Sequence, residues 1–317
     1  MRARKGRFMN TKQSITTRGK SGKIFFWVMM TLPILQFLIF YIGVNFNNVI
    51  LAFQTYDKNT GKFDFPQVDA FVRIYESRKE LWIYFKNSLQ FFLANAVIVM
   101  PLTLLFAYYI FRKFFMGGFF KILLFLPSVI CCMVLLIFYE YFVDSVFVTF
   151  IGKIKDEKAL PILTGMLKAG EEWKLWCALM FFSIIVGFSG SILLYLNAMT
   201  QISSSVLEAA RIDGAGEARI FFSVVIPGVW GTIVSLLTVS MAGMLTNQAY
   251  LFNLFGNDAR QFIQTMGYYL YVTINPDTPN YIEYPYVAAL GVVLTLIIAP
   301  ITIAVRKLML TFGPSEE

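Results

Sequence analysis

The chain has 317 residues, of which 57% are hydrophobic and only 15% are charged, and its formal net charge is +8. Soluble globular proteins carry about 25% charged residues, so this composition excludes an ordinary soluble domain and is typical of a protein embedded in a bilayer. The sequence contains no histidine, which excludes Ser/His and Cys/His catalysis, HExxH zinc sites and His-ligated haem.

The first 23 residues are strongly basic. They contain no acidic residue and eight basic ones: Arg2, Arg4, Lys5, Arg7, Lys12, Arg18, Lys20 and Lys23. Because basic residues are enriched on the cytoplasmic side of membrane proteins, this segment predicts a cytoplasmic tail and not a nucleic-acid-binding arm. Gly19-Lys20-Ser21 matches the end of a phosphate-binding P-loop, but Ser14 replaces the first glycine and no strand is expected before it. ATP binding by this chain is therefore not predicted.

Six apolar stretches are near the roughly 20 residues that a helix needs to cross about 30 Å of hydrocarbon. They cover residues 24–44, 87–111, 122–142, 176–197, 224–245 and 285–305. Lipid cannot satisfy backbone polar groups, so each stretch must be helical or part of a closed barrel, and the absence of alternating polarity excludes barrel strands. The sequence predicts an all-α integral membrane protein with six transmembrane helices in one domain, residues 24–305.

The distribution of charge predicts the orientation of these spans. Six spans place both termini on one side of the membrane, together with residues 112–121 and 199–223. That side has a net charge of +10 and the opposite side −2, which together give the +8 of the whole chain. The positive-inside rule then places both termini in the cytoplasm, with residues 306–317 as a C-terminal cytoplasmic tail. The segments expected outside are 45–86, 143–175 and 246–284.

The three cysteines, Cys131, Cys132 and Cys177, all lie inside apolar stretches. A disulfide framework or a CxxC metal site is therefore not predicted. Free cysteine usually behaves as a small buried hydrophobic residue, and we expect these three to be buried. No metal site is expected on this chain.

The cytoplasmic segment between the fourth and fifth spans has a regular internal pattern. Ser205 and Glu208 have the spacing of a capping box, which predicts a short helix starting at Val206. Gly214 follows where a left-handed residue would end that helix. A second helical stretch, from about Glu217, is expected to run into the fifth span through Pro227. The segment is either a plain interfacial loop helix or a docking element for another protein.

One motif in this segment resembles a known family. Glu208-Ala209-Ala210, then Gly214, then Val224-Val225-Ile226-Pro227 is similar to the EAA motif of binding-protein-dependent ABC importer permeases, E-A-A-x3-G-x9-I-x-L-P. Val224 and Ile226 are conservative departures from it. Asp213-Gly214-Ala215 resembles the version in sugar-type permeases of the maltose and glycerol-phosphate transporter class. Weaker similarities to the same family occur at Phe53-Gln54-Thr55-Tyr56-Asp57, Lys86-Asn87-Ser88-Leu89 and Leu126-Pro127.

The resemblance implies a type I ABC importer permease fold and a heteromeric complex in a bacterial or archaeal plasma membrane. The implied partners are a second permease, expected to be a paralogue, two ATPase subunits and an external solute-binding protein. The ATPase binds ATP and Mg, so no cofactor is expected on this chain. The residues implied in coupling to the ATPase are Glu208, Ala209, Ala210, Asp213, Gly214, Gly216 and Pro227.

Polar and small residues inside the spans are candidates for a substrate pathway, because such residues tend to face a cavity or the bundle interior. The candidates are Asn95, Ser183, Gly187, Ser240, Gly243 and Asn247, with Ser189, Gly190 and Ser191 as further small or polar positions. Neutral amides and hydroxyls beside aromatic rings suit sugar hydroxyls, which need hydrogen bonds without a countercharge. The alternative is that the glycines and serines only let helices approach closely. Resemblance to maltose-type permeases favours the positions on the spans that flank the EAA loop.

The sequence therefore predicts a transport subunit of a carbohydrate importer and not an enzyme. The alternative is an ion-coupled secondary transporter or channel that works without an ATPase. No run of carboxylates or Asp/Lys pairs crosses the spans, as a proton relay would require, which disfavours this alternative. Recovery of an ATPase with the chain distinguishes the two.

Overall fold

The computed structural model describes residues 20–58, 60–146, 149, 172–274 and 280–314. The chain divides into two compact units, Met1–Leu51 and Ala52–Glu317. Residues 1–19 of the predicted basic tail lie outside the described residues, as do residues 315–317 of the predicted C-terminal tail. Both tails stay predictions.

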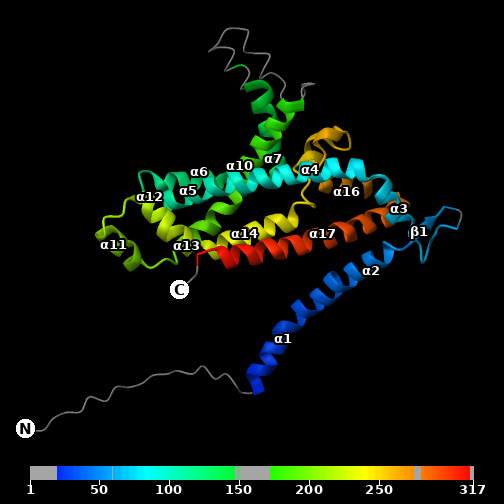
Figure 1. The fold of residues 1–317 in the computed structure, drawn as a ribbon, viewed down its shortest axis with the longest axis horizontal. Helices are drawn as coiled ribbons and strands as arrows, with labels where there is room; N and C mark the ends of the chain where they lie inside the picture. The colour runs from blue at the N-terminus through cyan, green and yellow to red at the C-terminus, as the bar shows by residue number, and fades with distance from the viewer. Residues whose placement is uncertain (1–19, 59, 147–148, 150–171, 275–279, 315–317) are drawn as a thin grey trace, which may run out of the picture. The chain divides into compact units, whose positions relative to one another are not determined.

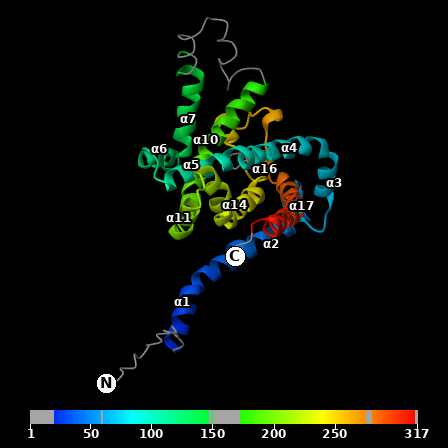
Figure 2. The same cartoon turned by 60° about the vertical axis from the view of Figure 1, so that its left-hand side comes forward.

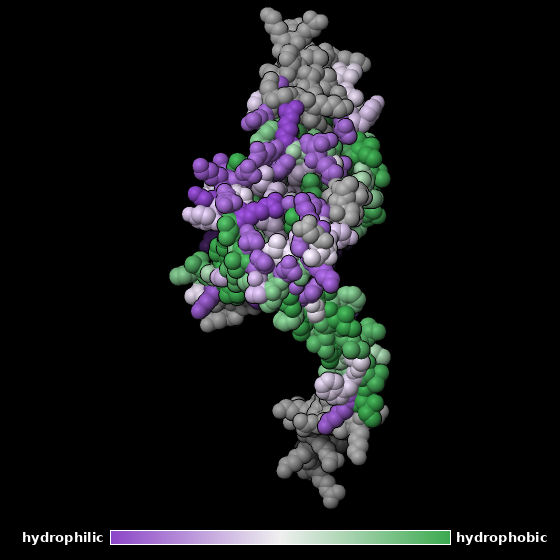
Figure 3. All heavy atoms as spheres, turned by 90° about the vertical axis from the view of Figure 1, so that its right-hand side faces the viewer, coloured by the Kyte–Doolittle hydropathy of each residue, from purple (hydrophilic) through white to green (hydrophobic). Residues whose placement is uncertain are grey.

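The first unit contains one continuous helix. Its parts are α1 (Lys20–Gln36), the π-helical turn η1 (Phe37–Gly43) and α2 (Val44–Leu51). None of the described side chains from Lys23 to Leu51 is buried, and in Figure 3 the helix is a rod of mainly hydrophobic side chains. These 29 residues are long and apolar enough to cross a membrane, with a length of about 43 Å. The predicted first span, residues 24–44, lies inside this helix.

The second unit contains three long apolar helices. Each is long enough to cross a membrane. They are Arg78–Phe111, α10 (Glu172–Met199) and α17 (Glu283–Phe312). The first of them consists of α4 (Arg78–Ala94), the π-helical turn η2 (Asn95–Val99) and α5 (Met100–Phe111). They contain the second, fourth and sixth predicted spans.

Two further apolar segments are bent helix pairs. The first pair, α6 (Gly117–Val129) and α7 (Cys132–Tyr141), bends by 104°. The second pair bends by 66° at Val229, between a helical segment that covers Glu217–Gly228 and α14 (Trp230–Gly243). That segment consists of α12 (Glu217–Ile220), the π-helical turn η5 (Phe221–Val225) and α13 (Ile226–Gly228). The described residues thus hold four membrane-length helices, or up to six if each bent pair is one span.

The expectation of a continuous helix over residues 122–142 is wrong. Ile130 and Cys131 have extended backbone, with ψ of 138° and 131°, and they separate α6 from α7. Pro127 removes one backbone hydrogen bond from the last turn of α6, and the β-branched Val129 and Ile130 favour extended backbone. The hydrophobicity of the sequence does not predict this bend, because α6 and α7 are equally apolar.

Shorter elements connect the long helices. They are the antiparallel strands β1 (Thr55–Asp57) and β2 (Lys62–Asp64), with Thr55 opposite Asp64, and the helices α3 (Asp69–Glu76), η3 (Phe142–Val146), α11 (Ser204–Ile212), α15 (Leu251–Phe255), η6 (Gln261–Ile263) and α16 (Met266–Ile274). In Figures 1 and 2, α11 lies at one end of the second unit and α3 with the hairpin at the opposite end. Hydrophilic side chains gather over the α3 end in Figure 3.

Ion pairs at the two ends agree with the predicted sidedness of the loops. At the α3 end, Arg73 pairs with Glu283 at 2.8 Å, and both residues belong to or border segments predicted to lie outside. At the α11 end, Arg112 pairs with Glu217, and both belong to segments predicted to be cytoplasmic. Segments expected on one side of the membrane therefore lie together in the fold.

The core of the second unit forms where the long helices pack. Ala107 of α5 is fully buried against Tyr195 and Met199 of α10, while Met266 of α16 and Leu290 of α17 are buried beside α4. The small alanine lets α5 approach α10 closely, as is common between membrane helices. These contacts hold the long helices of the second unit together.

The prediction of buried cysteines is wrong. Cys131 and Cys177 are exposed on the surface of the chain and Cys132 is half-buried, and all three are free. In a membrane protein an apolar stretch presents one face to lipid, so an apolar position need not lie in the protein core.

Candidate functional site

A cavity of about 340 Å³ lies between α4, η2, α10, α14 and the segment after α14. Its wall combines hydroxyl and amide groups with aromatic and apolar side chains, which is the usual character of a small-molecule site. The lining residues are Ser88, Phe91, Phe92, Asn95, Ser183, Ser240, Gly243, Met244, Thr246, Asn247 and Thr265. No charged side chain is among these described residues.

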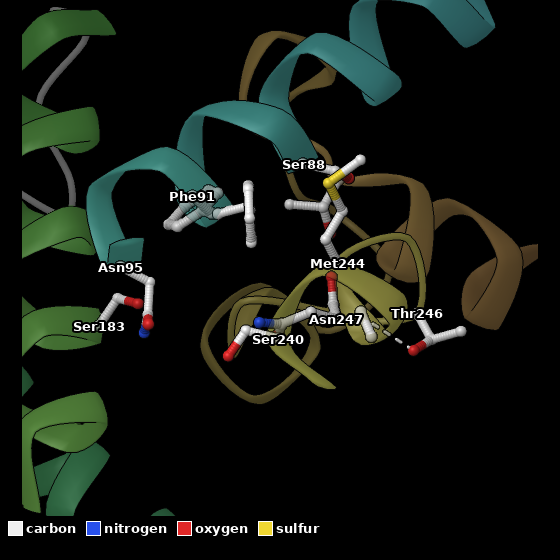
Figure 4. A pocket seen from close by; sticks show the side chains of 11 residues that line it. Ser88, Phe91, Asn95, Ser183, Ser240, Met244, Thr246 and Asn247 are labelled. Atoms are coloured by element: carbon white, nitrogen blue, oxygen red, sulfur yellow. Dashed lines mark hydrogen bonds between the residues drawn. The ribbon is translucent and has the colours of Figure 1, made fainter. Parts of the chain in front are cut away.

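The structure brings together five of the six residues predicted for a substrate pathway. Asn95, Ser183, Ser240, Gly243 and Asn247 all line the cavity, although they come from four different segments. In Figure 4 the side chains of Asn95 and Ser183 lie at one wall, and those of Ser240 and Asn247 lie at the opposite wall. The polar groups thus face a common space.

The sixth residue, Gly187, lies behind the wall. A Cβ atom at this position would be 3.0 Å from Nδ2 of Asn95 and 3.4 Å from a methyl group of Val99, so the glycine lets α10 approach η2 closely. For Gly187, close helix packing, which was the alternative to a pathway role, is therefore the better description. A Cβ atom at Gly190 would meet no atom within 4 Å.

Asn95 is positioned by a change of helix type. It is the first residue of the π-helical turn η2, inside the otherwise α-helical Arg78–Phe111. A π-turn adds a residue and changes the direction in which the following side chains point, and such turns are frequent at functional sites. Nothing in the apolar pattern of residues 87–111 predicts this turn.

The segment after α14 forms the outer rim of the cavity through hydrogen bonds to buried polar groups. Nδ2 of Asn87 donates to the carbonyl oxygens of Phe262 and Gln264 at 2.8 and 2.9 Å. Oγ of Ser88 accepts from the backbone N–H of Met266 at 2.9 Å. Asn87 and Ser88 are both buried, with exposed fractions of 4% and 2%.

Asn247 is held in this rim by two further hydrogen bonds. Its backbone oxygen accepts from Oγ1 of Thr265 at 2.8 Å, and its side-chain oxygen accepts from the N–H of Ala249 at 2.8 Å. The side-chain amide nitrogen is then the polar atom that Asn247 turns towards the cavity (Figure 4). Sequence reasoning missed three polar cavity residues, Ser88, Thr246 and Thr265. The one available signal was that Ser88 is a polar residue inside an apolar stretch.

Asn87→Ala is expected to destabilise the rim. The substitution removes the donor from two partly buried carbonyl oxygens, which costs about 1 kcal/mol or more. The thermal midpoint of the detergent-solubilised protein should fall, whereas Asn197→Ala, at an exposed position on α10, should leave it unchanged. Equal midpoints for both variants would contradict the rim assignment.

Two further hollows continue from the cavity along α10 and α14. The next is a neck of only about 20 Å³ that shares Phe92, Asn95 and Ser240 with the cavity and includes Tyr195 and Leu236. Leu236 also lines a groove of about 310 Å³ with Asn197, Gln201, Thr232 and Ser235. A space of about 20 Å³ holds about one water molecule. The described linings of both hollows contain no charged side chain.

The helix of the EAA-like segment begins earlier than predicted. Its first residue is Ser204 rather than Val206, and Ser203 takes the N-cap position with extended backbone. Oγ of Ser203 lies 2.8 Å from Oγ of Ser205, so the capping box expected between Ser205 and Glu208 is not the cap of this helix. Ser203 and Ser205 are both residues that suit an N-cap position. The spacing between Ser205 and Glu208 favoured Ser205 in the prediction.

The end of the helix follows the prediction. Gly214 has φ of +76°, a left-handed conformation that glycine adopts without steric cost. Its N–H donates to the oxygen of Arg211, and the N–H of Ala215 donates to the oxygen of Ala210, each at 3.0 Å. These two bonds make a Schellman motif. Gly216 then caps α12, which begins at Glu217 as expected, and Pro227 lies in α13 just before the bend.

Most side chains of α11 are exposed in the part of the chain that the structure describes. Leu207 is its one buried residue, while Glu208 and Ala209 are exposed and Ala210 is half-buried. The apolar side chains of Val206 and Ile212 are 48% and 86% exposed. Together with Ala209 they recur every three residues, so they share one outward face of the helix. An exposed apolar face with small residues is typical of a protein interaction surface.

Residues 100–310 match the family described as "Binding-protein-dependent transport system inner membrane component". The "Multiple sugar-binding transport system permease protein MsmF" of Streptococcus mutans is 25% identical over 310 residues, covering 94% of this chain and 99% of the relative. The "Arabinooligosaccharides transport system permease protein AraP" of Bacillus subtilis is 24% identical over 295 residues, covering 90% and 88%.

Two solved structures have the same fold. A chain of a bacterial ABC transporter involved in the import of the acidic polysaccharide alginate superposes with a TM-score of 0.71 at 18% identity, covering 90% of this chain and 96% of that chain. A chain of the bacterial alginate ABC transporter in complex with an alginate pentasaccharide-bound periplasmic protein gives 0.68 at 17% identity, covering 91% and 94%. The predicted permease fold is confirmed, and this chain belongs to the family of inner membrane components of binding-protein-dependent transport systems.

Proposed function

We propose that this chain is a permease subunit of an ATP-driven importer for an uncharged carbohydrate. The observation that carries the proposal is the neutral polar cavity, which opens beside a neck and a second neutral groove along α10 and α14. Sugar hydroxyls both donate and accept hydrogen bonds, and Ser, Thr and Asn side chains match them. The relatives MsmF and AraP, whose names refer to sugars and arabinooligosaccharides, support this substrate class.

The absence of charged lining residues favours an uncharged sugar over an acidic one. The structural neighbours import alginate, an acidic polysaccharide. An acidic sugar moved out of water requires countercharges, because an unpaired buried charge is strongly disfavoured. The described cavity residues of this chain offer hydroxyls, amides, rings and a thioether, but no guanidinium or ammonium group.

The complex that we propose contains a second permease, two ATPase subunits and an external solute-binding protein. The ATPase subunits bind ATP and Mg, and this chain binds neither. The alginate transporter in complex with a periplasmic protein supports the binding-protein partner. The complex resides in a bacterial or archaeal plasma membrane, with both termini of this chain in the cytoplasm.

Coupling to the ATPase runs through α11 and the turn that follows it. Its outward face, Val206, Ala209 and Ile212, has the exposure that docking requires. Glu208 supplies a charge at this surface, and Gly214 fixes the direction in which the chain leaves it. ATP-driven movement of the ATPase shifts α11 as a rigid element and switches the cavity between the two sides of the membrane.

Affinity purification in mild detergent with mass spectrometry tests this proposal. We expect an ATPase and a second permease to be recovered with the native chain, and to be lost or reduced with a Glu208→Ala/Gly214→Val variant. Glu76→Ala, which removes an exposed carboxylate at the opposite end of the unit, is the matched control and should recover both partners. Recovery of this chain alone, with uptake unaffected by the loop variant, would instead support an ion-coupled secondary transporter.

A further inference from the structure

A cluster of three side chains ties α12 to the end of α5. We call Tyr108, Arg112 and Glu217 the α5–α12 clamp. Nε of Arg112 donates to Oε2 of Glu217 at 2.9 Å, and its second guanidinium nitrogen donates to Oε1 of the same carboxylate. The hydroxyl of Tyr108 donates to Oε2 of Glu217 at 2.6 Å. One carboxylate thus receives a two-pronged ion pair and a hydroxyl bond from two successive turns of one helix.

The clamp is shielded on the side of α5, while the Glu217 side chain is 46% exposed. The Arg112 side chain is only 7% exposed, and Tyr108 is 6% exposed. The Tyr108 ring lies 5.0 Å from that of Phe221, beside the fully buried Ile220. The hydrogen bond to Glu217 raises the pKa of Arg112 above its ordinary value, although burial acts in the opposite direction. Two-pronged arginine–carboxylate bonds in such surroundings fix geometry as well as adding stability.

The position of the clamp gives it a mechanical consequence. Leu207 of α11 is buried, and Ala210 is half-buried, in the core cluster that includes Tyr108, so a displacement of α11 reaches the rest of the unit through these side chains and through the chain at its two ends. At the C-terminal end, the Gly214 turn leads within three residues to Glu217, where the clamp begins. The clamp then connects to α5, which is continuous with η2 and with Asn95 in the cavity wall. Asn95 lies about 25 Å along this helix from Arg112.

We propose that the α5–α12 clamp is a positioning element that transmits displacement of α11 to the cavity wall at Asn95. The inference rests on the proposed function, since it requires that α11 is displaced by an ATPase. It adds a second connection from α11 to the cavity, besides the direct one through α10 to Ser183. Arg112 and Glu217 lie 105 positions apart in sequence, and no sequence pattern joined them.

The test uses the complete transporter reconstituted in liposomes with its ATPase, its binding protein and a neutral oligosaccharide. Uptake per ATP hydrolysed is measured for Arg112→Gln, Glu217→Gln and the double variant. Each single variant removes a charge-assisted hydrogen bond, and such a bond changes an equilibrium constant about tenfold. We therefore expect uptake per ATP hydrolysed to fall about tenfold. The double variant should be no worse than either single one, because both remove the same interaction. The amount of co-purifying ATPase should not change.

Two further variants make the test independent of misfolding. Tyr108→Phe removes one hydroxyl from the clamp with almost no change in volume, and we expect a smaller fall in uptake per ATP. Tyr109→Phe is the matched control, because its hydroxyl bonds to the backbone oxygen of Phe115 at 2.6 Å and not to Glu217. It should keep the native ratio. Similar ratios for Tyr108→Phe and Tyr109→Phe, together with native ratios for the charge variants, would overturn the inference.

Glu208→Ala in the same assay separates this inference from the proposed function. If Glu208→Ala uncouples uptake from ATP hydrolysis while the clamp variants remain coupled, the proposed function stands and the clamp has no positioning role. If neither Glu208→Ala nor the clamp variants alter the ratio, the docking role of α11 fails as well. A fall in the ratio for both sets supports the complete path from α11 to Asn95.

Discussion

Ser240→Trp should abolish uptake. Ser240 lines both the cavity and the neck of about 20 Å³ below it, and that neck has no room for an indole ring. Overpacking costs about 1–3 kcal/mol, and the upper value corresponds to a fall of about a hundredfold in the rate of uptake. Uptake of a labelled neutral oligosaccharide into proteoliposomes measures the effect. The variant should still co-purify with its partners, since Ser240 lies far from α11.

Val239→Trp is the matched control for this substitution. Val239 is the preceding residue of α14, and it does not line the cavity or the neck. The same indole ring there should leave uptake near the native rate. Similar rates for the two tryptophan variants would mean that substrate does not pass Ser240.

Gly267→Ala should disrupt the outer rim of the cavity. A Cβ atom at Gly267 of α16 would lie 2.5 Å from the carbonyl carbon and oxygen of Thr246 and 2.7 Å from the carbonyl carbon of Asn247. These are backbone atoms, so no side-chain rotation relieves the clash and the segment must move. Overpacking of this kind costs about 1–3 kcal/mol or more. Both the thermal midpoint and the rate of uptake should fall, because Asn247 moves with its backbone.

Gly291→Ala provides the comparison for this prediction. Gly291 lies in α17, and a Cβ atom there would meet no atom within 4 Å. Alanine is about 1 kcal/mol more favourable than glycine inside a helix, so this variant should be as stable as the native chain or slightly more so. A Gly267→Ala protein with native stability and uptake would show that the rim tolerates displacement of Thr246 and Asn247.

Local features of the sequence were enough to predict several parts of the molecule. The apolar stretches follow from the length of a helix that crosses a bilayer, and helices occupy all six of them. The left-handed turn at Gly214 and the helix start at Glu217 follow from turn and cap chemistry within a few residues. The polar positions Asn95, Ser183 and Ser240, which line the cavity, were selected because a polar group inside a span needs a partner or a cavity.

Cap chemistry also shows the limit of local reasoning. Ser203 and Ser205 are both suitable N-caps, and the spacing to Glu208 favoured the wrong one. The three cysteines were expected in the core because free cysteine is usually buried, but in a membrane protein an exposed apolar face is equally stable. In both cases the local pattern allowed two placements, and the residues near it in sequence did not distinguish between them.

The sequence by itself determined that the chain is a multi-span helical membrane protein, which loop resembles the coupling segment of importer permeases, and which spans contain polar residues. Only the tertiary structure decided the rim held by Asn87 and the clamp between Arg112 and Glu217. The physical reason is the distance along the chain over which each kind of interaction acts. Hydropathy and capping act between residues a few positions apart, whereas these features depend on packing or on pairs more than 100 positions apart, which a single sequence does not record.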